Sequence, residues 1–211
     1  MREVGQYYYI KWGEVMAISD DLAKTLGNFY KTCKYEKFMF KYQSYMDNKK
    51  INSEIKNYLR ILNTNFLFLV DEKKAFREYE RINLPTENKY IQAFHFLNVI
   101  YLTKKKMFTD AKDKLQIMKK YRSLSKEDIK SLEIFIDVYC DKDIPDIEKM
   151  FSLNNPILYQ NVFNARILMD YFALKGDKKC SDYASFLVKQ KTDFTDTVNR
   201  AKEIVAIFKQ K

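Results

Sequence analysis

Five side chains that can carry a positive charge recur in this 211-residue chain at intervals of 35 or 36 residues. They are Lys24, Arg60, His95, Lys130 and Arg166. Cationic side chains form charge-assisted hydrogen bonds with carboxylates, so a row of them would bind an acidic segment. The alternative is that basic residues are simply common here, with 38 Lys and Arg against 28 Asp and Glu, and reach exposed positions without binding anything.

Residues for catalytic chemistry are scarce. His95 is the single histidine, and it has no acidic or cysteine neighbour at a fixed spacing that would make a proton relay. No Gly-rich phosphate loop, HExxH or GxSxG motif occurs. Cys33, Cys140 and Cys180 lie far apart without a CxxC pair, which predicts neither a zinc site nor a disulfide framework and fits a reducing compartment. We therefore expect no enzyme activity and no cofactor or metal.

The composition predicts a folded, all-α protein. Hydrophobic residues make up 46% of the chain, which is enough for a core. Only 4 Gly and 3 Pro occur, whereas sandwiches, barrels and α/β folds need both residues at many turns. The apolar stretches are too short to span a bilayer, and the first residues lack the apolar run of a signal peptide. We expect a cytoplasmic protein.

An internal repeat organises the chain. A leucine is followed four residues later by an aromatic residue or Ile at five places, spaced by 35 or 36 residues: Leu26–Tyr30, Leu62–Phe66, Leu97–Tyr101, Leu132–Ile136 and Leu168–Phe172. The four-residue step puts both side chains on one face of a helix. After each pair a break and a second amphipathic segment follow, so each period predicts a helical hairpin.

These patterns give the expected boundaries. Residues 1–18 would form an aromatic N-terminal arm or helix, which could pair two copies of the chain. Residues 19–190 would hold five units, at about 19–50, 51–85, 86–124, 125–154 and 155–190. In the fourth unit the second helix is expected to be short, because it contains Pro145. Residues 191–211 would form an amphipathic helix that caps the end of the array.

The hairpin units resemble the tetratricopeptide repeat. The first unit carries Leu26-Gly27-Asn28-Phe29-Tyr30, and the second has Ala75 thirteen residues after Leu62 and Pro85 near its end. The resemblance covers roughly residues 19–190. The motif's glycine is replaced in the later units and its tryptophan is absent. The resemblance implies an α-α superhelix, a solenoid of about five hairpins with a concave groove.

The resemblance also implies where a ligand would bind. In this family the repeat position of Lys24, Arg60, His95, Lys130 and Arg166 faces the concave groove, which would make a basic ladder there. Lys24 with Asn28 is similar to the first Lys and Asn of the family's carboxylate clamp, whereas the later clamp positions fall at Gln92 and Phe96. Asn28, Asn57 and Gln92 are expected to hydrogen-bond a peptide backbone.

The leading hypothesis is a non-catalytic scaffold that binds a protein or peptide, such as an acidic or C-terminal segment, in a basic concave groove. One alternative is the peptide-sensing portion of a transcription regulator, without a DNA-binding module because residues 1–18 are too short for one. Another is nonspecific nucleic-acid binding through the net charge of +10. The lysines are spread over the predicted turns, which favours a protein partner over specific nucleic-acid recognition.

Overall fold

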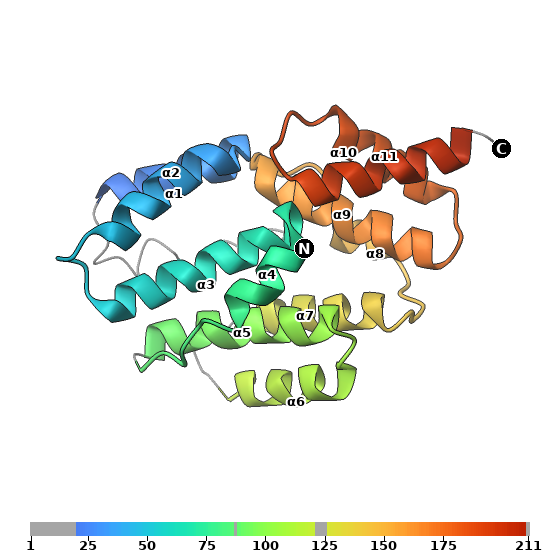
Figure 1. Cartoon of the computed structure of the whole chain (residues 1–211). Coiled ribbons are helices and arrows are strands. Elements are labelled where there is room, and N and C mark those ends of the chain that lie inside the picture. Colours follow the sequence, from blue (N-terminus) through green and yellow to red (C-terminus); the bar gives the residue numbers. More distant parts are fainter. Residues whose placement is uncertain (1–19, 87, 121–125, 210–211) are drawn as a thin grey trace.

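The computed structural model describes residues 20–86, 88–120 and 126–209 (Figure 1). Within these ranges the chain forms eleven helices and no strand, which confirms the predicted all-α class. The predicted arm at residues 1–18 lies outside the described residues.

Four pairs of consecutive helices pack against each other, α1 with α2, α3 with α4, α5 with α6 and α9 with α10, and α11 is the last described helix (Figure 1). Their bounds are α1 Asp20–Thr32, α2 Tyr35–Asp47, α3 Ser53–Val70, α4 Glu72–Tyr79, α5 Asn88–Lys104, α6 Phe108–Met118, α7 Lys126–Tyr139, α8 Ile147–Met150, α9 Leu158–Leu174, α10 Lys179–Lys189 and α11 Thr195–Lys209.

The five repeated leucines form part of the core, as the repeat predicts. Leu26, Leu62, Leu97, Leu132 and Leu168 are all 5% exposed or less. They lie on α1, α3, α5, α7 and α9, the first helices of the five predicted units. Side chains spaced four residues apart on these helices therefore lie on one continuous buried face.

Local geometry repeats with the same period at the ends of α5, α7 and α9. Two residues after each of these helix ends stands a left-handed residue, Lys106, Asp141 or Gly176, and these residues are 35 positions apart. The amide of the next residue donates to a carbonyl five residues back, in the bonds Met107 N to Leu102 O (2.9 Å), Lys142 N to Asp137 O (3.1 Å) and Asp177 N to Phe172 O (2.9 Å). This is the Schellman turn, which satisfies the last carbonyls of a helix. The chain therefore leaves these three helices through the same kind of turn.

The second helix of the fourth predicted unit is short, as expected. The helix α8 spans only four residues, Ile147–Met150, and Asp146 just before it has a positive φ of 57°. Proline cannot donate to a preceding helical turn, so the chain after α7 stays irregular until it has passed this residue. Asn52 caps the start of α3, where its side chain accepts a 2.8 Å hydrogen bond from the Ile55 amide.

Contacts between the two ends of the chain go beyond those of neighbouring hairpins. The helix α1 packs against α9, and α11 packs against α3 as well as α10. The Phe29 ring lies 5.7 Å from the Tyr159 ring and 6.0 Å from the Phe194 ring, and Lys34 pairs with Asp193 at 3.1 Å. In an open solenoid each unit touches only its neighbours. The C-terminal helix therefore does more than cover one end of the array.

The interior between the first helices is closely filled. Two cavities of about 30 and 20 Å³ lie there, and both are lined by Asn65, Ile100 and Phe163 from α3, α5 and α9. A cavity needs about 10 to 15 Å³ to hold one water molecule. These spaces are too small for a peptide.

Candidate functional site

A polar groove with a volume of about 640 Å³ lies between α2, α3 and α4. Ligand pockets in proteins commonly measure about 300 to 1,000 Å³. We call this space the α2–α4 groove, and its lining residues are Met39, Tyr42, Gln43, Met46, Asp47, Arg60, Asn63, Lys74, Glu78 and Arg81.

The groove contains two cations that the protein leaves available. Arg81 pairs with Glu78 at 2.9 Å, and the Gln43 amide donates a 2.9 Å hydrogen bond to Asp47, so both groove carboxylates have partners. In the described part of the chain, the half-buried side chains of Arg60 and Lys74 make no ion pair or hydrogen bond. A half-buried cation without a counter-charge attracts an anionic group more strongly than a fully solvated one.

The base of the groove is held by uncharged contacts. The Tyr35 hydroxyl donates a 2.7 Å hydrogen bond to the Asn63 side-chain oxygen. Burial raises the pKa of Tyr35 and of Tyr42, so both phenols stay neutral at physiological pH. Met39 and Met46 add flexible apolar walls that can adapt to a guest side chain.

Arg60 is the one residue of the predicted set that lines this groove. Lys24 and Asn28 are exposed on α1, and Lys130 is exposed on α7. Gln92 is half-buried on α5. Their binding role stays a prediction.

Two of the predicted binding residues, on α3 and α5, are engaged or buried within the protein instead. The Asn57 amide donates to the Asn83 carbonyl at 2.7 Å and accepts from the Asn83 amide at 3.1 Å, which ties α3 to the segment after α4. His95 is buried, and burial together with Lys114 on α6 lowers its pKa. Its lowered pKa therefore arises from burial and from a neighbouring helix, and not from other members of the predicted ladder.

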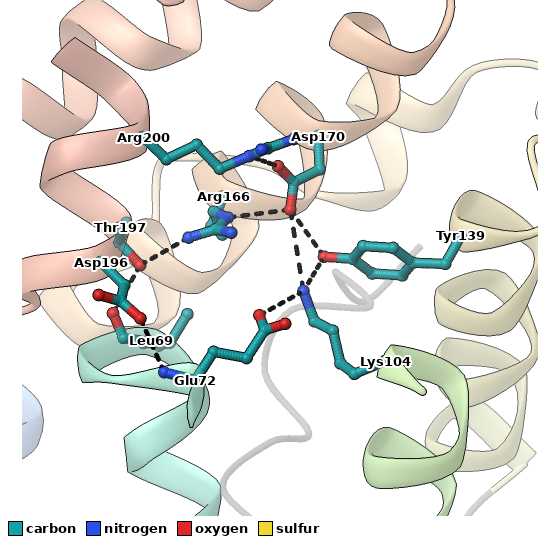
Figure 2. A network of polar contacts seen from close by, with 9 residues as sticks. All are labelled: Leu69, Glu72, Lys104, Tyr139, Arg166, Asp170, Asp196, Thr197 and Arg200. Atoms are coloured by element: carbon teal, nitrogen blue, oxygen red, sulfur yellow. Dashed lines mark hydrogen bonds and ion pairs between the residues drawn. The ribbon is translucent and has the colours of Figure 1, made fainter. Parts of the chain in front are cut away.

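Arg166 is buried inside the protein, within a network of polar contacts that Figure 2 shows. Its Nε donates a 2.9 Å hydrogen bond to the Asp170 carboxylate one helical turn later, and its Nη1 donates to the Thr197 hydroxyl at 3.2 Å. Its guanidinium therefore already has a counter-charge. This finding takes Arg166 out of a solvent-facing basic ladder and gives it a structural role.

Asp170 is the centre of this network (Figure 2). Besides Arg166, it accepts hydrogen bonds from Arg200 Nε at 2.7 Å and from the Tyr139 hydroxyl at 2.8 Å. The Lys104 ammonium lies 3.9 Å from the same carboxylate and donates to the Tyr139 hydroxyl at 2.6 Å. The side chains of Asp170 and Lys104 are 3% and 9% exposed. One carboxylate thus pairs with cations from helices α5, α9 and α11.

Burial and neighbouring charges shift the pKa values of Asp170 and Lys104 in opposite directions, whereas both raise that of Tyr139. Burial alone would raise the pKa of the Asp170 carboxyl, but Arg166, Lys104 and Arg200 hold it well below its ordinary value of 3.8. Burial lowers the pKa of Lys104, against the pull of Asp170 and Glu72. Burial and then Asp170 raise the pKa of Tyr139 far above its usual value, so its hydroxyl remains a donor.

The network missed by the sequence reading has a repeat signal of its own. Lys104 and Tyr139 are 35 residues apart, at the equivalent position in the last turns of α5 and α7. Leu69, whose backbone carbonyl accepts from Thr197, precedes Lys104 by the same spacing on α3. A search restricted to the five cationic positions of the ladder could not find this set, because its members lie nearer the helix ends.

No protein-family model, curated protein sequence or solved structure matches the chain. Among the described residues, no group of three His, Cys, Asp or Glu side chains is placed to hold a metal ion. None of the helices that the structure describes is long and apolar enough to cross a membrane.

Proposed function

We propose that this chain is a non-catalytic helical-repeat scaffold of tetratricopeptide-like hairpins that binds an acidic peptide segment in the α2–α4 groove. The observation that carries the proposal is the pair Arg60 and Lys74, two half-buried cations on facing helices without a counter-charge of their own in the described chain. A guest with two carboxylates supplies the missing negative charge, and charge-assisted hydrogen bonds are about twice as strong as neutral ones.

The rest of the groove favours a peptide over a free anion. Its volume of about 640 Å³ has room for several side chains. Met39 and Met46 offer apolar contact next to the cations, and Gln43 offers an amide beside them for hydrogen bonding. The guest that uses all of these features is a segment with acidic residues beside an apolar one.

The hairpin architecture of the proposal is supported by two independent periodicities. One is the burial of the repeated leucines, and the other is the 35-residue recurrence of the Schellman turn after α5, α7 and α9. Helical-repeat proteins characteristically present a binding surface made by several consecutive units. The α2–α4 groove likewise takes its walls from the first and second hairpins.

The first prediction concerns binding of a short fluorescein-labelled peptide with two glutamates flanking a leucine. We expect fluorescence anisotropy to show saturable binding that weakens as salt is added, because salt screens charge pairs. The double substitution Arg60→Glu and Lys74→Glu should raise Kd by about tenfold or more, since each hydrogen bond to a charged group contributes roughly 1.5 to 3 kcal/mol.

A matched control changes the net charge equally outside the groove. Lys24→Glu with Lys130→Glu reverses two exposed members of the predicted ladder and should leave Kd within about threefold, because surface charges act weakly at a distance. If the control variant loses binding and the groove variant keeps it, the ladder is the site. Equal binding of a peptide with glutamines in place of glutamates, or tighter binding of a single-stranded oligonucleotide, would contradict the proposal.

A further inference from the structure

The turn between α3 and α4 is unusually tight. The helix α3 ends at Val70, α4 begins at Glu72, and only Asp71 lies between them. Asp71 accepts a 2.8 Å hydrogen bond from the Lys74 amide, so it caps the start of α4. The last carbonyls of one helix and the first amides of the next therefore meet at a single residue, and such groups have no partners within their own helices.

The N-terminal turn of α11 supplies partners to backbone groups on both sides of this turn. The Thr197 hydroxyl donates to the Leu69 carbonyl at 2.8 Å, and the Asp196 carboxylate accepts from the Glu72 amide at 2.7 Å (Figure 2). More than 120 residues separate these partners along the sequence. Two consecutive residues of the C-terminal helix thus clamp the end of α3 and the start of α4.

The clamp is itself held by the buried network. Thr197 is fully buried and accepts a hydrogen bond from Arg166, which Asp170 holds in turn. Lys104 lies 3.6 Å from the Glu72 carboxylate, so α5 also contacts the first residue of α4 (Figure 2). A satisfied buried polar network of this kind favours one arrangement of its members over others, because any displacement leaves a buried group without its partner.

The two helices that meet at the turn also carry the two available groove cations. Arg60 belongs to α3 and Lys74 to α4, and the angle at Asp71 sets how these two walls face each other. We infer that Asp196 and Thr197 are positioning residues for the α2–α4 groove, although neither lines it. This inference rests on the proposed function. It assigns the C-terminal helix a role in setting affinity for the acidic segment, through the α3–α4 turn.

The test uses the full chain with Thr197→Val, which keeps the shape of the side chain and removes its hydroxyl. We expect hydrogen exchange of the α4 amides to accelerate by about tenfold, because a buried hydrogen bond holding the turn is lost, while the α6 amides stay unchanged. Kd for the acidic peptide used above should rise by about three- to tenfold. Thr197→Ser, which retains the hydroxyl, should restore both values.

The control variant removes a different side-chain hydroxyl in the C-terminal half of the chain, that of a tyrosine. Tyr183→Phe deletes the hydrogen bond from Tyr183 to Glu148, which links α10 to α8 and involves none of the clamp residues. It should change neither α4 exchange nor Kd. If Thr197→Val does not fold, Asp196→Ala removes the other half of the clamp and is measured in its place.

The outcomes separate the two proposals. Unchanged α4 exchange in the clamp variants, or faster α4 exchange with unchanged Kd, overturns the positioning role. If the unsubstituted protein fails to bind the peptide, the proposed function is wrong, and the exchange data by themselves decide whether α11 holds α4 in place. A loss of peptide binding in Tyr183→Phe as large as in Thr197→Val would mean that general loosening, and not the clamp, sets the affinity.

Discussion

Replacing Asp170 by asparagine is expected to destabilise the protein by about 3 to 5 kcal/mol, a large share of the roughly 5 to 15 kcal/mol that stabilises a typical domain. The substitution keeps the size of the side chain and removes its charge. Arg166 would then remain buried without the carboxylate to which it donates, and Lys104 would keep only Glu72, at 3.6 Å. A buried cation that has lost its counter-charge has lost its hydration without compensation. Urea denaturation followed by circular dichroism measures the change.

The same substitution should remove a pH dependence. The pKa of Asp170 is lowered on folding, so the ionised carboxyl stabilises the protein at every pH above the unfolded value of about 3.8. As the pH falls below that value, the unfolded chain takes up a proton that the folded chain still rejects, and the stabilisation is lost. Between about pH 4 and pH 2 the stability of the unsubstituted protein should fall more steeply than that of Asp170→Asn.

Asp143→Asn is the matched control. Asp143 also pairs with a lysine, Lys175, at 3.0 Å, but its side chain is 93% exposed. Solvent screens an ion pair of this kind, and we expect little change in stability or in its pH dependence. If Asp170→Asn behaved like Asp143→Asn, the buried network would not stabilise the fold in the way that its geometry indicates.

The helices and their buried faces could be predicted from the sequence because local spacing determines them. A leucine followed by an aromatic residue four positions later places both on one side of a helix, whatever lies around it. Pro145 acts through the backbone of its own segment, so the short second helix of the fourth unit could be predicted in the same way.

The contacts between distant helices could not be predicted from local spacing in the sequence. Arg166 and Asp170 are four residues apart in an otherwise apolar stretch of α9, which is a local signal for a buried ion pair. Their partners Tyr139, Lys104 and Arg200 belong to three other helices, and only the packing of those helices brings them together. The ladder hypothesis grouped Arg166 by repeat position, whereas its neighbours on α9 determine its burial.

The candidate groove was missed for a related reason. Lys74 lies on α4, the second helix of its hairpin, and Arg81 follows that helix. The sequence reading compared only equivalent positions on first helices, which found Arg60 and not its companions. A groove between a second helix of one hairpin and both helices of the next involves positions with no common repeat number, so periodicity alone cannot reveal it.

The second large effect is expected at Phe29, where Phe29→Ala should cost about 3 to 5 kcal/mol. The side chain is 1% exposed. Its ring lies within 4.4 to 6.5 Å of six other aromatic rings, those of Tyr30, Tyr35, Phe38, Phe66, Tyr159 and Phe194. Removing it leaves a cavity among rigid rings, which cannot collapse to fill the space.

The set of helices that Phe29→Ala destabilises distinguishes a closed arrangement of hairpins from an open one. Phe29 on α1 contacts Tyr159 on α9 and Phe194 just before α11, so Phe29→Ala should accelerate hydrogen exchange in α9 and α11 as well as in α1. In an open array the disturbance would pass only from α1 to its sequence neighbours. Phe40→Ala, at a side chain that is 78% exposed on α2, is the control and should change neither stability nor exchange in these helices. Faster exchange confined to α1, α2 and α3 in Phe29→Ala would show that the two ends of the chain are not coupled through this aromatic cluster.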